Sequence, residues 1–301
     1  MNTQLFALAI FDGVAYAALV FLVAVGLTLI FGVLQILNVA HGSFYAIGAY
    51  ATASLGGMVF AAGFSPYLAF PLMLIVAVLV GIALGGLIEQ FLLKRIYVKE
   101  GALQLLVTFA VFMILEDVQR LVWGVQPYFE SSALQALGNI KVLGITYTVY
   151  QLIVLPCIAL AVLICLRLFL RRTLSGKLIL AVTEDREAAT SIGIDADRVY
   201  LLTFIVGAAL AAFGGALASA TTSVVPGMGA DMIVLSFAVV ATAGLGQIEG
   251  AALTALLIGL GRSFAVYLMP ELQVLVPYLI MLLVLLVRPQ GLFGIAQARK
   301  I

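Results

Sequence analysis

The sequence has few charged residues. Of its 301 residues, 15 are Lys or Arg and 14 are Asp or Glu, so 10% are charged, whereas soluble domains carry about 25%. Hydrophobic residues make up 64%, which leaves too little polar surface to cover a water-soluble particle. No charge occurs between Asp12 and Glu89, a stretch long enough for about three helices of roughly 20 residues. The scarcity of charge excludes a soluble enzyme and indicates a polytopic membrane protein.

Cysteine and histidine are also scarce, and several motifs are missing. Cys157 and Cys165 lie in one apolar stretch, which suggests neither a disulfide framework nor a metal site. His41 is the only histidine, and no H-E-x-x-H or G-x-S-x-G motif occurs, which argues against an intramembrane enzyme. Gly176-Lys177 lacks the flanking residues of a phosphate-binding loop. We therefore expect no ATPase activity and no cofactor in this chain.

Apolar stretches separated by charges, glycine and proline predict nine membrane segments. Their expected ranges are 10–34, 42–62, 68–92, 101–123, 148–170, 199–221, 232–247, 250–268 and 272–288. The seventh and ninth are short, so at least one segment is expected to be broken or re-entrant, and a count of eight, with 35–45 dipping in and out, stays open. The predicted fold class is an all-α polytopic integral membrane protein, a bundle of about 8–9 transmembrane helices in one domain over residues 1–301.

The basic residues predict the orientation of the bundle. When the nine segments alternate, twelve of the fifteen Lys and Arg residues fall on one side of the membrane. Arg120, Lys141 and Arg262 fall on the other side. Because basic loops stay in the cytoplasm, we expect a bacterial inner-membrane protein with its N-terminus outside and its C-terminus cytoplasmic. The loop 124–147 is then external and the loop 171–198 cytoplasmic.

The cytoplasmic loop 171–198 concentrates charges of both signs. Thr183 precedes Glu184, Asp185 and Glu187, an order that favours a helix of about ten residues with acids in its first turn. Gly193 follows as the expected end of this helix. On these grounds alone, an amphipathic connector and a docking element for a partner are both possible.

The same loop carries a recognisable motif. Glu187-Ala188-Ala189 followed by Gly193 resembles the EAA loop of ABC-importer permeases, a short helix that docks onto a cytoplasmic ATPase. The Ile-x-Leu-Pro end of the wider pattern is absent, because Thr203, Ile205 and Val206 stand there. This shortened form is similar to that of permeases of the branched-chain amino-acid type.

Three further blocks extend the resemblance over nearly the whole chain. Gly26–Gly32 followed by Asn38–Ser43 resembles the start of the LivH-type branched-chain amino-acid ABC transporter permease family, and Gly244–Gly250 and Arg288–Gly294 resemble its later glycine-rich turn and its terminal block. The resemblance implies the permease subunit of an importer for branched-chain or related amino acids. It also implies a second homologous permease, two ATPase subunits that bind ATP and Mg²⁺, and a periplasmic substrate-binding protein.

Two other functions remain open. A permease for urea or short amides would belong to the same family. A secondary transporter would need acids or histidines at membrane depth for ion coupling, and only His41 qualifies.

Two groups of residues are candidates for function. The expected substrate-pathway residues are Thr28, Asn38, His41, Gly42 and Ser43, because a polar break at membrane depth must be buried or line a cavity. A helix beginning near Gly42 would present free amides to a carboxylate, whereas a structural or gating role is the alternative. The expected ATPase-coupling residues are Glu184, Asp185, Glu187, Ala188, Ala189 and Gly193. No catalytic or metal-binding residue is expected.

Other charged residues in the segments are expected to pair at the membrane interfaces. Glu89 is expected to pair with Lys94 or Arg95. Glu116 and Arg120 share a helix face. Arg262 is expected to pair with Glu271 or Asp231, with a gate contact as the alternative.

Overall fold

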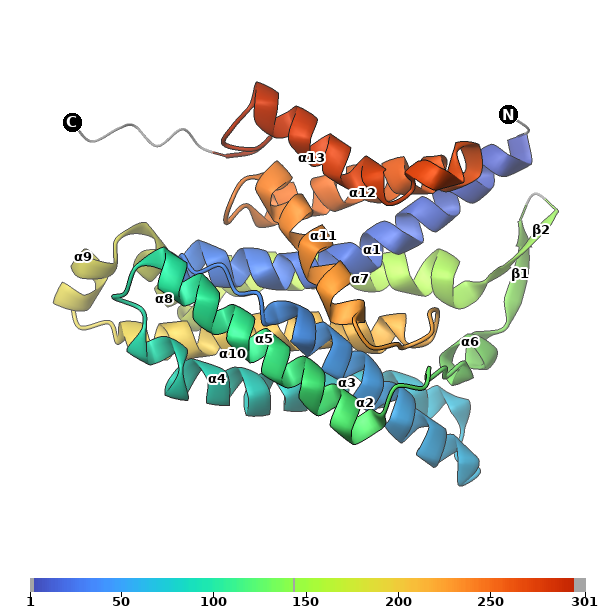
Figure 1. Ribbon diagram of the computed structural model, residues 1–301, viewed down its shortest axis with the longest axis horizontal. Helices are drawn as coiled ribbons and strands as arrows, with labels where there is room; N and C mark the ends of the chain where they lie inside the picture. The colour runs from blue at the N-terminus through green and yellow to red at the C-terminus, as the bar shows by residue number, and fades with distance from the viewer. Residues whose placement is uncertain (1–2, 143, 295–301) are drawn as a thin grey trace.

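The computed structural model describes residues 3–142 and 144–294, and nine apolar helical segments make up its bundle (Figure 1). In chain order they are α1 (Thr3–Leu34), α2 (His41–Ala61), η1–α3–η2–α4–η3 (Pro66–Arg95), α5 (Gly101–Trp123), η4–α7 (Tyr150–Arg172), α10 (Ala196–Ala218), α11 (Met228–Ala243), α12 (Ile248–Leu268) and α13 (Leu275–Val287). The all-α membrane fold is confirmed.

Seven of the segments are long enough to cross a membrane, and α11 and α13 are shorter. The third segment is interrupted by a π-helical turn, η2 (Gly81–Gly85), between α3 (Ala69–Val80) and α4 (Gly86–Phe91). The fifth begins with another, η4 (Tyr150–Val154), before α7 (Leu155–Arg172). Irregular turns of this kind are common at functional sites and bends of helices.

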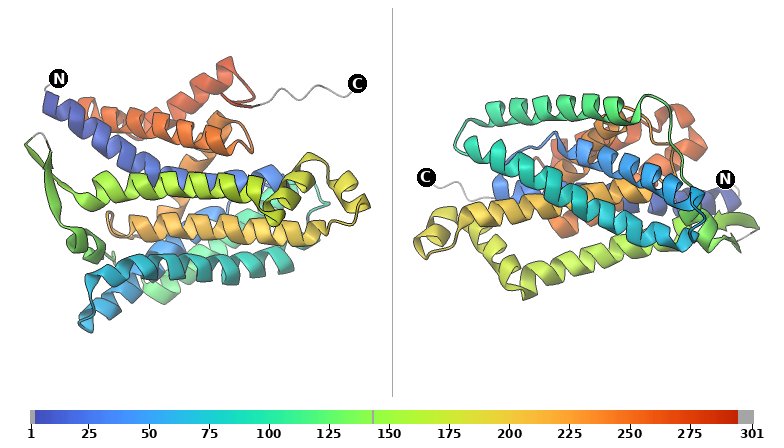
Figure 2. Two further views of the ribbon diagram at one scale, coloured as in Figure 1. Left: turned by 180° about the vertical axis from the view of Figure 1, so that it is seen from behind. Right: turned by 90° about the horizontal axis from the view of Figure 1, so that it is seen from below.

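The two ends of the bundle carry different extra elements (Figures 1 and 2). One end, here the hairpin end, bears α6 (Ser132–Leu137) and an antiparallel pair, β1 (Asn139–Val142) and β2 (Ile145–Thr148), in which Asn139 lies opposite Thr148. The other end, here the coupling end, bears α8 (Leu174–Glu184) and α9 (Arg186–Ser191). The sequence predicted no element for the loop 124–147, because two four-residue strands carry almost no periodic signal.

Small residues hold the centre of the bundle together. Helix α10 packs along both α1 and α2, and α11 also contacts both α1 and α2. A methyl group added at Gly215 would overlap the carbonyl oxygen of Tyr45, and one added at Gly48 would overlap that of Ala212. Such glycines let helix backbones approach closely in lipid, where apolar surfaces alone give little preference for protein over lipid.

Candidate functional site

The polar turn before α2 lies in the interior of the bundle. Thr28, Asn38, His41 and Ser43 are each 0% exposed. Thr28 donates a hydrogen bond to the carbonyl oxygen of Ala24 in its own helix, at 2.7 Å. The side chains of Asn38 and Ser43 have no hydrogen-bond partner among the described residues. The structure thus buries these four predicted pathway residues inside the chain, with Thr28 bonded within α1 and the other three in the turn and first residues of α2.

His41 ties the first turn of α2 to the middle of α1. Its Nε2 lies 3.0 Å from the carbonyl oxygen of Val23, which can only accept, so Nε2 carries the proton. The ring also packs edge-on against Phe44 at 6.2 Å between centroids, and Phe44 contacts Phe204 of α10 in the same way at 6.0 Å. These contacts give His41 a structural role, and contact between the turn and substrate stays a prediction.

The amides at the start of α2 are already bonded. The N–H groups of His41, Gly42 and Ser43 donate to the carbonyls of residues 38–40, at 3.3, 3.3 and 3.0 Å. Thr108 of α5 braces the same turn by donating to the carbonyl of Leu37 and accepting from the N–H of Val39. The expectation of free amides at this helix start is therefore wrong, because the turn itself supplies their acceptors.

The coupling loop 171–198 forms two helices where one was predicted. Asp185, rather than Thr183, caps the second helix, α9, by accepting from the N–H of Ala188 at 3.0 Å. The backbone leaves the helical path at Asp185 (φ −153°, ψ 104°), which separates α8 from α9. Gly193 ends α9 with φ +91°, a conformation that favours glycine, as the sequence predicted.

The predicted coupling residues lie together on and around α9. Glu184, Asp185, Glu187, Ala188 and Gly193 are exposed, and only Ala189 is buried. The nearby Ile192 is 79% exposed, an apolar side chain on an otherwise charged surface. The structure thus exposes most of the predicted coupling residues on and around a short helix, and their role in docking stays a prediction.

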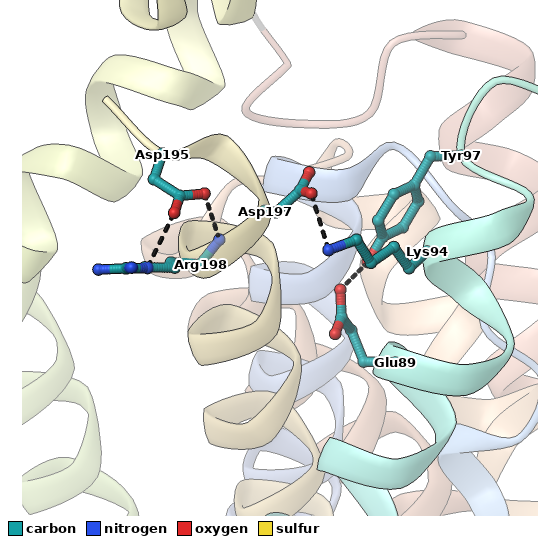
Figure 3. A network of polar contacts seen from close by, with 6 residues as sticks. All are labelled: Glu89, Lys94, Tyr97, Asp195, Asp197 and Arg198. Atoms are coloured by element: carbon teal, nitrogen blue, oxygen red, sulfur yellow. Dashed lines mark hydrogen bonds and ion pairs between the residues drawn. The ribbon is translucent and has the colours of Figure 1, made fainter. Parts of the chain in front are cut away.

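A polar network fixes the base of this element to the bundle (Figure 3). Lys94 pairs with Asp197 of α10 at 2.9 Å, and Asp195 both caps α10 and pairs with Arg198 at 2.8 Å. Arg186 of α9 lies 5.2 Å from the ring centroid of Tyr200. The start of α10 therefore connects α9 to the loop that follows α4.

Glu89 has a different partner from the expected one. It is 1% exposed and accepts a hydrogen bond of 2.5 Å from the hydroxyl of Tyr97, while Lys94 turns to Asp197 (Figure 3). Burial, and then the hydrogen bond to the Glu89 carboxylate, raise the pKa of Tyr97 well above its usual range, so the phenol stays protonated as donor. Gln104 of α5 fixes this loop by donating to the carbonyls of Ile96, Tyr97 and Lys99.

The hairpin end holds a cavity, lined by both charged and apolar side chains, that no sequence pattern predicted. It measures about 230 Å³ and is lined by α1, the turn η4, the start of α7, the turn that follows α10, and α12. Asp12 accepts hydrogen bonds from the hydroxyls of Tyr147, at 2.5 Å, and Tyr267. The three residues are far apart in sequence, so only the folded chain brings them together.

Arg262 lines the same cavity, and the prediction that it pairs with Glu271 or Asp231 is wrong. Its guanidinium carbon lies 4.1 Å from the ring centroid of Tyr16, and the side chain forms no ion pair or hydrogen bond with any described residue. Arg120, by contrast, pairs with Glu116 at 2.6 Å, which confirms their shared helix face. Spacing in the sequence can predict an ion pair between residues one turn apart in the same helix, such as Glu116 and Arg120. It cannot predict that a side chain such as Arg262 has no ion-pair partner among the described residues.

A larger cavity of about 860 Å³ lies at the coupling end. It is lined by residues from the ends of several helices, among them Phe31, Gln35, Glu184, Gln247 and Gln290. Because Glu184 belongs to both this cavity and the α8–α9 junction, the predicted coupling element borders an opening in the bundle.

Comparisons with known proteins agree with this architecture. The family model described as the permease component of the branched-chain amino acid transport system matches residues 9–285. The high-affinity branched-chain amino acid transport system permease protein LivH of Salmonella typhimurium is 28% identical over 297 residues, covering 97% of this chain and 96% of that protein. The LivH protein of Escherichia coli is 27% identical over 307 residues with the same coverage. A probable LivH of Methanocaldococcus jannaschii is 28% identical, over 94% of this chain and 90% of that protein.

A solved structure shares the fold. A chain of PsaBC from Streptococcus pneumoniae in complex with Fab aligns with a TM-score of 0.50 at 14% identity, covering 96% of this chain and 94% of that one. The match to the family model spans all nine helical segments except the first few residues of α1 and the last few of α13. This chain therefore belongs to the permease family of the branched-chain amino acid transport system.

Proposed function

We propose that this chain is one permease subunit of an ABC importer that moves branched-chain amino acids across the bacterial inner membrane. The family match over residues 9–285 carries the proposal, and relatives that align end to end are named for this transport. In this proposal a second homologous permease completes the pathway, two cytoplasmic ATPase subunits bind ATP and Mg²⁺, and a periplasmic binding protein delivers the substrate.

The coupling end is proposed to face the cytoplasm, with α9 seated on an ATPase subunit. In support, the basic segments around Lys94 and Arg171 meet at this end, as expected of a cytoplasmic face. The exposed Glu187 on α9 and Ile192 just after its last residue offer a charge and an apolar contact. Helix α13 ends at the same end, where Leu285 and Pro289 line one cavity with Glu184, so the C-terminus is proposed to be cytoplasmic as well.

The experiment is charge reversal on α9. Glu187→Lys in the assembled transporter is expected to lower co-purification of the ATPase subunits at least about tenfold, because a buried docking charge would meet a like charge. ATP-driven leucine uptake in proteoliposomes should fall in parallel, while leucine binding to the isolated periplasmic protein stays unchanged.

Glu271→Lys is the matched control. Glu271 is exposed in η5 (Pro270–Leu272) near the hairpin end, so its reversal changes the net charge equally without touching α9. ATPase subunits that remain bound to Glu187→Lys as well as to Glu271→Lys would contradict the proposed docking. Leucine uptake that needs an ion gradient and no ATP would instead indicate a secondary transporter.

A further inference from the structure

The hairpin-end cavity contains a cation without a partner. Arg262 lies in the membrane segment α12, half buried, with its guanidinium over the ring of Tyr16 and no acceptor among the described residues. Asp231, in the first turn of α11, is close enough to act electrostatically on Tyr16 but forms no ion pair with Arg262. Charged side chains in membrane segments are costly and usually face a partner or a water-filled path. An unpaired arginine that lines a cavity is therefore complementary to an anionic ligand.

The same cavity contains a carboxylate held in place. The two oxygens of Asp12 accept from Tyr147 and Tyr267, which fix its orientation and leave lone pairs for further donors. Asp12 and Tyr16 lie on one face of α1, four residues apart, and both line the cavity with Arg262. One negative and one positive group are thus presented to the same space.

The remaining walls combine small polar groups with aliphatic side chains. Ser263 is 4% exposed and its hydroxyl has no hydrogen-bond partner among the described residues, which leaves a buried polar group for a ligand to satisfy. Leu19, Leu155 and Val266 supply apolar walls. At about 230 Å³ the cavity is smaller than the roughly 300–1,000 Å³ pockets that take drug-sized ligands, which limits it to a small molecule.

We infer that this cavity is a binding station for the substrate inside the permease, in which Arg262 holds the α-carboxylate of an aliphatic amino acid and Asp12 its ammonium group. The hydroxyl of Ser263 adds a polar contact, and the aliphatic walls receive the side chain. The inference rests on the proposed import of amino acids and adds a site to it. A ligand that lacked either charge would leave Arg262 or Asp12 unsatisfied, so the station selects zwitterions.

The station lies near the hairpin end, which is the external side in the proposed orientation. An amino acid released by a periplasmic protein would meet this cavity before the centre of the bundle. The aromatic face of Tyr16 stabilises the guanidinium while no substrate is bound, without neutralising it as a carboxylate would. Binding is therefore expected to be weak and reversible, as passage requires.

The test measures ligand contact by saturation-transfer NMR on the complete membrane complex in nanodiscs, without the periplasmic protein. The probes are L-leucine, L-leucinamide, which lacks the carboxylate, and 4-methylpentanoate, which lacks the ammonium group. In the unmodified protein, leucine is expected to bind at least about tenfold more tightly than either analogue, the range of one charge-assisted hydrogen bond.

Substitutions at Arg262 and at Asp12 test the two charged groups of the site separately. Arg262→Gln should weaken leucine binding about tenfold, to the level of leucinamide, whereas Arg262→Lys should retain part of the affinity because it keeps the charge and loses the planar fork. Asp12→Asn should weaken leucine binding to the level of 4-methylpentanoate binding. This variant should still bind leucine more tightly than leucinamide. Arg120→Gln is the matched control, because Arg120 is also near the hairpin end but is already paired with Glu116.

Several outcomes would overturn the station. Equal leucine binding in the unmodified protein, Arg262→Gln and Arg120→Gln would do so, as would an Arg262-dependent signal from a phospholipid with none from leucine. ATP-driven leucine uptake by the unmodified complex is measured alongside. Leucine uptake that is unchanged in both Arg262→Gln and Asp12→Asn refutes the station alone. An unmodified complex that shows no leucine uptake refutes the proposed function.

Discussion

The buried centre of the bundle and its two ends are stabilised in different ways. In the centre, α10 meets α1 and α2 through glycine and alanine, and nearly nine-tenths of the most apolar stretch of α1 is buried. At the coupling end, charged side chains pair with one another at the surface, as Lys94 does with Asp197. The hairpin end differs from both, since Arg262 lines a cavity without a partner among the described residues.

The centre and the ends therefore respond to different kinds of substitution. In the centre a single methyl group decides whether two helices fit, because the backbones are in contact. At the coupling end a single exposed charge contributes little, because water screens it and competes for it. Function is therefore expected where a charge is neither paired nor fully solvated, and Arg262 meets that condition.

The largest effect is expected in the centre. Gly215→Val should abolish folding, because the added side chain would overlap the Tyr45 carbonyl and separate α2 from α10, at a cost above about 3 kcal/mol. Membrane-inserted protein recovered in a monodisperse peak after detergent extraction measures this. Gly101→Val is the control, since nothing lies within 4 Å of a methyl group at Gly101. A monodisperse Gly215→Val protein at normal yield would contradict the close approach.

A smaller loss is expected at the polar turn. His41→Ala should lower the free energy of unfolding by about 2–5 kcal/mol, as large-to-small core substitutions do, because it leaves a cavity and removes the contact to Val23. His41→Gln keeps an N–H donor and should restore much of this stability in a thermal denaturation series. Normal stability in His41→Gln combined with slow leucine uptake would favour contact between His41 and the substrate over a structural role.

Much of the fold follows from the sequence because long apolar runs have one stable solution in lipid. The nine segments were predicted within about three residues at each end, except that α1 extends to Thr3 and that α11 (Met228–Ala243) lies four residues earlier than the predicted 232–247. The polar turn at 38–43 and the end of α9 at Gly193 were also anticipated, since polar residues within an apolar run and a glycine after a helix carry local signals. These features depend on neighbours in sequence.

The rest depends on contacts between distant segments. No local pattern indicates that Asp12 accepts from Tyr147 and Tyr267, or that Lys94 prefers Asp197 to Glu89. The second helix begins after Asp185 and not after Thr183, because the backbone leaves the helical conformation at Asp185. The composition of the loop does not indicate this break. The hairpin-end cavity could have been suspected only from Arg262, a charge in a membrane segment with no oppositely charged residue one turn away in its own helix.

The smallest effects are expected at the coupling end, where the two contacts of one loop differ in burial. Tyr97→Phe should lower the free energy of unfolding by about 1–3 kcal/mol, because it leaves the buried Glu89 carboxylate without its donor. Lys94→Met removes an exposed ion pair in the same loop and should cost less than about 1 kcal/mol. Thermal denaturation of the two variants side by side gives the comparison. A larger loss in Lys94→Met than in Tyr97→Phe would mean that charge pairing, rather than burial of a polar group, holds this end of the bundle together.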